Sequence, residues 1–102
     1  MKKIINGKKY DTETATPVAS FSNSGGWRDF AHYEETLYRK KTGEFFLYGE
    51  GGPMTKYARS TGLNSWSGGD GFEPLTEDEA KLWLERFSDT ETYEAQFGAV
   101  EE

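Results

Sequence analysis

The sequence predicts an α+β domain, in which a small antiparallel β-sheet arranged as a meander carries two C-terminal helices on one face. Two observations indicate this class. Residues 30–49 first alternate in polarity and then run apolar after a Thr-Gly turn, which is typical of a β-hairpin. Residues 76–98 repeat apolar side chains at helical spacing. Strands followed by helices favour a sheet with helices packed against it.

Length and composition limit what the chain can be. Its 102 residues match one domain, which we expect over residues 1–98 with a frayed tail over 99–102. Hydrophobic residues are 34% but aromatic residues are 16%, so we expect a small core built from Phe, Tyr and Trp. The absence of cysteine and the single histidine exclude a disulfide scaffold, a thiolate zinc site and a multi-His metal site.

No apolar run approaches the roughly 20 residues of a membrane span. The basic start of the chain also lacks the apolar stretch of a signal peptide. We therefore expect a cytoplasmic protein with no membrane partner, no metal and no cofactor.

The N-terminal segment is predicted to form short strands joined by turns. The Asn-Gly pair at 6–7 separates two short strands, because both residue types accept the positive φ of a two-residue hairpin turn. Asp11 is expected to cap one helical turn over 11–15. A short strand is expected over 16–21, at a sheet edge because Pro17 cannot donate to a ladder.

The central hairpin is the clearest β signal. In the strand expected over 31–40, successive residues point to opposite faces, so the adjacent Glu34 and Glu35 cannot form a carboxylate pair. The partner strand over 44–49 contains Phe-Phe-Leu-Tyr at 45–48. Such a run is typical of a central strand covered on both faces.

The glycine-rich segments that follow are less regular. Residues 60–71 are predicted to form a long loop pinned by the indole of Trp66, and residues 72–74 to return briefly to the sheet. Residues 54–58 fit either a helical turn or an irregular segment. Trp27 and Trp66 both lie beside glycines, and each can either plug a small core or serve as an exposed recognition anchor.

Two helices are predicted near 77–87 and 90–97. Thr76 and Glu79 form a capping box at the start of the first, and residues 88–91 are predicted to form a second capping box. Three acids in the first turn also suit the positive end of the helix dipole. The apolar stripe of the first helix, expected to face the core, consists of Ala80, Trp83, Leu84 and Phe87.

Charge is distributed unevenly along the chain, whose net charge is −6. Residues 1–60 carry 10 Lys or Arg and 7 Asp or Glu, whereas residues 61–102 carry 2 and 11. Residues 61–102 therefore carry a net charge of −9, whose electric field repels nucleic acid and attracts basic protein clefts. The simpler interpretation is a solvated face that keeps a small protein soluble. The acids predicted to bind a partner are Asp70, Glu73, Glu77, Asp78, Glu85 and Asp89.

Three further features could carry function. His32 titrates near neutral pH and, with Glu34, could serve as a general acid or base in RNA cleavage, or be an ordinary strand histidine. The glycines at 49–52 lack P-loop spacing and predict instead a sharp turn with positive φ. The basic residues of the first 60 positions are interleaved with tyrosines, a pattern that can bind single-stranded nucleic acid.

Several segments carry a resemblance to known proteins. Residues 6–15 (NGKKYDTETA) match the opening of the pattern and residues 35–54 (ETLYRKKTGEFFLYGEGGPM) its central signature. Residues 74–76, 79–80 and 93–98 match its end. The pattern resembles a family of small proteins carried by bacterial mobile elements and phages. Some members are similar to type II-A anti-CRISPR proteins, which inhibit the RNA-guided nuclease Cas9 by blocking guide-RNA assembly or, in a longer relative, by damaging the guide RNA.

The resemblance implies a non-enzymatic inhibitor that binds Cas9 in the cytoplasm of a bacterial host. Cas9 holds its guide in positively charged channels, which an acidic surface could occupy in competition with guide RNA. Two alternatives stay open: a nuclease that cleaves guide RNA, and an interaction module of a mobile element with another host target. The resemblance assigns no role to individual residues.

Overall fold

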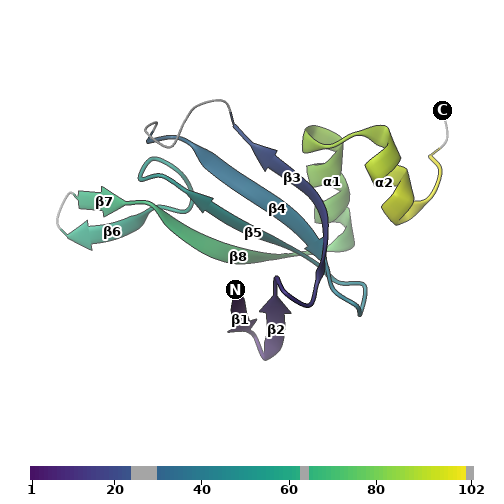
Figure 1. Cartoon of the computed structure of the whole chain (residues 1–102), viewed down its shortest axis with the longest axis horizontal. Helices are drawn as coiled ribbons and strands as arrows, with labels where there is room; N and C mark the ends of the chain where they lie inside the picture. The colour runs from purple at the N-terminus through teal and green to yellow at the C-terminus, as the bar shows by residue number, and fades with distance from the viewer. Residues whose placement is uncertain (24–29, 63–64, 101–102) are drawn as a thin grey trace.

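A computed structural model describes residues 1–23, 30–62 and 65–100 of the chain (Figure 1). Antiparallel strands are followed by two C-terminal helices, which confirms the predicted α+β class. The strands are β1 (Lys2–Ile5), β2 (Lys8–Asp11), β3 (Thr16–Ser22), β4 (Tyr33–Arg39), β5 (Phe45–Gly51), β6 (Arg59–Gly62), β7 (Ser65–Ser67) and β8 (Gly69–Leu75). The helices are α1 (Glu77–Phe87) and α2 (Thr90–Phe97).

The main sheet has four antiparallel strands in the order β3-β4-β5-β8. Its central pair, β4 and β5, confirms the predicted hairpin, and β5 continues to Gly51. Phe45 and Leu47 are buried beneath the helices, whereas Phe46 is fully buried on the opposite face. The apolar run of β5 is therefore covered on both faces, as predicted.

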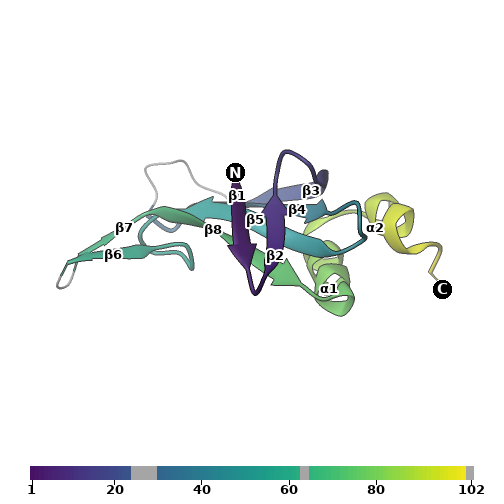
Figure 2. The ribbon, with the colours of Figure 1, turned by 90° about the horizontal axis from the view of Figure 1, so that it is seen from below.

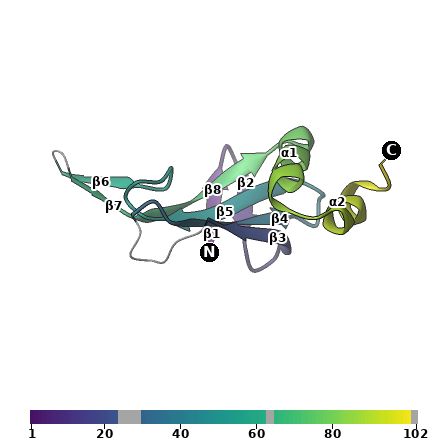
Figure 3. The same cartoon turned by 90° about the horizontal axis from the view of Figure 1, so that it is seen from above.

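The helices pack on one face of this sheet (Figure 3). Ala80, Trp83 and Leu84 are buried in α1 and Phe87 packs against the same core, which confirms the predicted stripe. The Thr76 capping box is also present. The second box is wrong in detail, because Asp89 is the N-cap of α2 and its carboxylate accepts from the backbone N of Thr92 at 2.8 Å.

The β1–β2 hairpin lies across the strands of the sheet (Figure 2) and packs on the face opposite the helices. Asn6 and Gly7 both have positive φ, as the two-residue turn requires. Tyr10 meets Phe46 edge to face, with ring centroids 5.4 Å apart. Residues 11–15 form the predicted single helical turn, because Ala15 N donates to Asp11 O at 3.1 Å, four residues back. The Asp11 carboxylate caps this turn by accepting from Glu13 N at 2.9 Å.

The predicted long loop over 60–71 is wrong. Strands β6 and β7 form a separate hairpin between β5 and β8, and this hairpin projects from one end of the sheet (Figure 1). Trp66 is 61% exposed, so its indole does not pin a loop to the core. Residues 53–57 form turns. Trp27 lies outside the described residues.

Candidate functional site

The exposed side of α1 is acidic. Asp78 and Glu85 are seven residues apart, which is two helical turns, so they lie on the same side of the helix, opposite the buried stripe. Glu77 lies beside Asp78 in the first turn, and all three side chains are exposed. Within the described part of the chain, none of the three forms an ion pair. We call Glu77, Asp78 and Glu85 the α1 acidic face.

The basic residues of α1 lie over aromatic rings. Lys81 Nζ lies 5.1 Å from the centre of the Phe97 ring on α2. The Arg86 guanidinium lies 5.1 Å from the centre of the Phe87 ring. One of these rings belongs to α2 and the other to the last residue of α1, and the carboxylates of the α1 acidic face are exposed to solvent.

The other three predicted acids already have partners within the chain. Asp70 is half-buried on β8, 2.9 Å from Arg59 and within 2.7 Å of the Tyr48 hydroxyl, which donates to it. Glu73 pairs with Lys56 at 3.3 Å. Asp89 caps α2, and hydrogen bonds from Thr92 lower its pKa. The structure therefore brings together only half of the predicted set.

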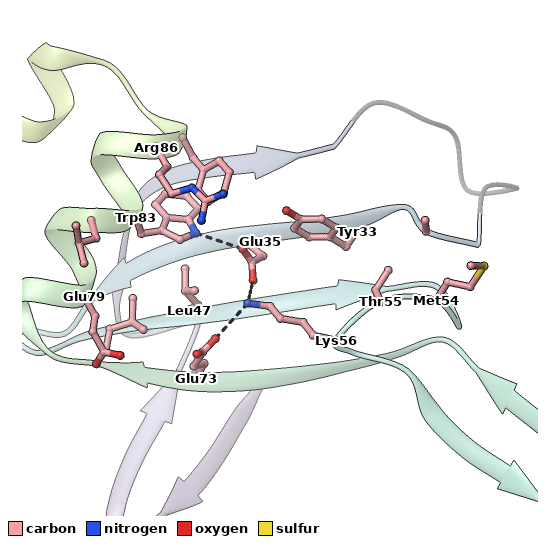
Figure 4. A pocket seen from close by; sticks show the side chains of 14 residues that line it. Tyr33, Glu35, Leu47, Met54, Thr55, Lys56, Glu73, Glu79, Trp83 and Arg86 are labelled. Atoms are coloured by element: carbon pink, nitrogen blue, oxygen red, sulfur yellow. Dashed lines mark hydrogen bonds and ion pairs between the residues drawn. The ribbon is translucent and has the colours of Figure 1, made fainter.

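A groove lies between α1, the sheet and the turns that follow β5 (Figure 4). Its volume is about 520 Å³. Tyr33, Trp83 and Phe87 form part of its lining, and Met54 and Leu82, 73% and 62% exposed, contribute further apolar surface. The groove is not hydrophobic throughout, because a cluster of charged groups lies within it.

Glu35 is the centre of that cluster and is only 3% exposed. Its Oε1 accepts from Trp83 Nε1 at 3.2 Å. Its Oε2 accepts from the Tyr57 hydroxyl and lies 2.6 Å from Lys56 Nζ. Lys56 also reaches Glu73, so this ammonium group lies between two carboxylates. We call Glu35, Lys56, Tyr57 and Trp83 the Glu35 network.

The electrostatics of the Glu35 network favour fixed charges. Burial disfavours the ionised carboxylate, but hydrogen bonds from Lys56, Tyr57 and Trp83 outweigh it and lower the pKa of Glu35. Burial also disfavours the charged Lys56, yet Glu35 and Glu73 raise its pKa. Burial and the hydrogen bond to Glu35 raise the pKa of Tyr57. None of these groups is thus tuned toward neutral pH, as a general acid or base would be.

The network was missed at the level of sequence, although one signal was available. Glu35 falls on the same strand face as Leu37, which the alternation of β4 places inside. A carboxylate at a buried position requires donors. Those donors come from α1 and from the turns after β5, and their convergence depends on tertiary structure.

The glycines after Tyr48 support the same network. The predicted positive φ is wrong, because Gly49 and Gly51 lie within β5 and are not among the glycines with positive φ. A Cβ on Gly49 would collide with the ring and hydroxyl of Tyr57. Gly49 is therefore needed for Tyr57 to cross β5 and reach Glu35.

His32 is only 5% exposed, just before β4. Its Nε2 lies 3.6 Å from a carboxylate oxygen of Glu34. The tyrosines of the basic half are largely used in packing: Tyr57 is buried, and Tyr38 stacks on Phe46 with ring centroids 5.2 Å apart. These rings are poorly placed to stack on nucleic-acid bases.

Across residues 1–23, 30–62 and 65–100, no group of three or more His, Asp or Glu side chains is arranged to hold a metal ion. Neither described helix is long and apolar enough to cross a bilayer. Comparisons with family models, curated proteins and solved structures give no match to this chain.

Proposed function

We propose that the protein is a non-enzymatic inhibitor that binds Cas9 through the α1 acidic face and hinders guide-RNA loading. The observation that carries this proposal is a group of three exposed carboxylates on α1: Asp78 and Glu85 lie opposite the buried stripe, and Glu77 lies beside Asp78 in the first turn. The net charge of −9 over residues 61–102 and the resemblance of the sequence to anti-CRISPR proteins add support.

The physical basis is competition for a positively charged channel. Cas9 holds its guide RNA and heteroduplex in such channels through backbone contacts. Carboxylates spaced along a rigid helix can replace phosphates there, and long-range attraction speeds the encounter. A loaded guide makes many more phosphate contacts than one helix face can offer. The inhibitor should therefore act before the guide binds and should fail to displace it afterwards.

An order-of-addition cleavage assay tests this proposal. We expect strong inhibition when the protein meets Cas9 before the guide RNA, and weak inhibition when the guide is already loaded. Equal inhibition in both orders would contradict competition with the guide.

Incubation with guide RNA alone is the second arm of the assay. The inhibitor proposal requires the RNA to remain intact. Shortened RNA would replace it with the nuclease alternative, for which His32 is the candidate general acid or base; its 5% exposure leaves little access for a substrate. A His32→Ala variant that stops the shortening would assign that activity to His32.

A further inference from the structure

The two edges of the main sheet differ in how well they are protected (Figure 1). The hydrogen-bond pattern shows which backbone groups point outward. Gly52 N donates to His32 O at 2.9 Å, so even-numbered residues of β4 bond to β5. Asn23 N donates to Tyr33 O at 3.2 Å, so odd-numbered residues of β4 bond to β3.

This alternation leaves the backbone groups of Ser20 and Ser22 on β3 without hydrogen bonds to β4. They lie opposite Thr36 and Glu34, whose own backbone groups bond to β5. The N–H and C=O groups of Ser20 and Ser22 therefore point away from β4, toward the open edge. No described strand pairs with that edge.

The opposite edge, β8, is protected. The odd-numbered residues of β5 and β8 form the hydrogen-bonded pairs between these two strands. The backbone N–H and C=O groups of the even-numbered residues Asp70 and Phe72, and the carbonyl of Pro74, therefore point outward. Arg59 donates to the Asp70 carbonyl at 2.9 Å, and Pro74 has no N–H to offer. A charge, an occupied carbonyl and a proline are devices that prevent a second strand from pairing.

On β3 such devices are confined to the N-terminal half. Pro17 lies there, and the register shifts between Pro17 and Ala19, which disrupts the ladder. From Ser20 to Ser22 the strand has no charge, no proline and no bulge. This short uncharged edge is therefore a template for another strand.

We propose that β3 pairs with β3 of a second copy of this chain, antiparallel and centred on Phe21. Ser20 then pairs with Ser22 of the second copy, and Ser22 with its Ser20. Each such pair exchanges two backbone hydrogen bonds, so the contact satisfies every outward group from Ser20 to Ser22. The proposal does not depend on Cas9 binding.

The side chains also favour a second copy as the occupant. Phe21 is half-buried, with its ring centroid 4.2 Å from that of Phe87. At the centre of the proposed pairing the two Phe21 residues lie directly opposite each other, where side chains approach most closely. Because β3 itself has no charge, two chains of net charge −6 can pair there without like charges facing each other across the two strands.

Charge substitutions at the two serines test both the contact and its register. Both side chains are exposed, so substitution leaves the core intact. In Ser20→Lys/Ser22→Lys, each lysine lies opposite a lysine of the second copy. In Ser20→Lys/Ser22→Glu, each lysine lies opposite a glutamate, so pairing is retained. Like charges directly opposite destabilise a strand pair and unlike charges stabilise it.

The measurement is molar mass by light scattering over a range of protein concentrations, with circular dichroism to verify folding. We expect wild type and the Lys/Glu variant to approach twice the 11.6 kDa monomer mass as concentration rises, and the Lys/Lys variant to stay monomeric. A wild type that is monomeric throughout, a Lys/Lys variant that still dimerises, or a Lys/Glu variant that does not would each overturn the proposal. Pairing with a strand of another protein by a monomeric wild type would also overturn it.

Discussion

Replacing Glu35 with glutamine tests whether the Glu35 network holds α1 and the turns after β5 together. Glutamine keeps the size of the side chain but offers one acceptor oxygen and one amide donor. If its oxygen faces Tyr57 and Lys56, its amide faces the Trp83 Nε1–H, and two donors oppose each other. The variant also leaves Lys56 without its buried counter-ion.

The expected cost follows from these contacts. A buried donor left unsatisfied costs about 1–3 kcal/mol. The ion pair to Lys56 adds no more than about 1 kcal/mol, because the side chain of Lys56 is 52% exposed and the charge is screened by solvent. We expect Glu35→Gln to lower the free energy of unfolding by about 1–4 kcal/mol, which corresponds to a fall in Tm of more than about 4 °C for a domain of this size.

The assay is urea unfolding followed by tryptophan fluorescence, with Glu34→Gln as the matched control. Glu34 is the next residue of β4, points to the other face and is 45% exposed, so its loss should cost less than about 1 kcal/mol. Equal costs for the two variants would refute the reasoning.

Acid unfolding gives a second measure of the same carboxylate. The folded pKa of Glu35 is lowered from 4.5, so its contribution to stability is fully present above that value and is lost as pH falls through the folded pKa. Stability of the wild type should therefore fall more steeply with acid than that of Glu35→Gln. Parallel profiles would contradict a carboxylate that is ionised in the folded state.

Other substitutions test packing and capping by thermal or urea unfolding. Trp83→Ala should cost about 3–5 kcal/mol, because it removes a buried ring, and a barely shifted melting curve would contradict its place in the core. Gly49→Ala should cost about 1–3 kcal/mol through its collision with Tyr57, whereas Gly62→Ala, whose Cβ meets nothing within 4 Å, serves as the control. Thr76→Ala should cost about 0.5–2 kcal/mol by removing the N-cap of α1, and an unchanged Tm would contradict that role.

Local signals account for the elements that the sequence predicted well. The alternation of β4, the apolar run of β5 and the capping box at Thr76 each depend on neighbours within a few residues. The bounds of α1 and α2 match the predicted 77–87 and 90–97 for the same reason. The single turn over 11–15 was also predictable from a local signal, because Asp11 caps it through the backbone N of Glu13.

The remaining features depend on contacts between distant segments. Residues 60–71 read as a loop because glycine is frequent there, yet β8 is held by pairing with β5, which local composition cannot reveal. The partners of Asp70 and Glu73 were hidden in the same way, since Arg59 and Lys56 lie 11 and 17 residues away. Five of the six predicted acids are exposed and Asp70 is half-buried, but local sequence could not show which of them pair with basic side chains.

The salt dependence of Cas9 binding by a charge-reversed variant tests the central claim most directly. Asp78→Lys/Glu85→Lys reverses two carboxylates of the α1 acidic face, and Glu13→Lys/Glu50→Lys makes the same change in net charge at two other exposed positions. Melting curves verify that both variants fold, because Asp78 also suits the positive end of the α1 dipole.

Binding to guide-free Cas9 is then measured at several salt concentrations. We expect wild-type affinity to fall as salt rises, the α1 variant to bind weakly with little salt dependence, and the control variant to bind more nearly like wild type. Salt-independent binding that survives reversal at Asp78 and Glu85 would contradict the α1 acidic face as the contact. The exposed Trp66 of the β6–β7 hairpin would then be the next contact to test by substitution.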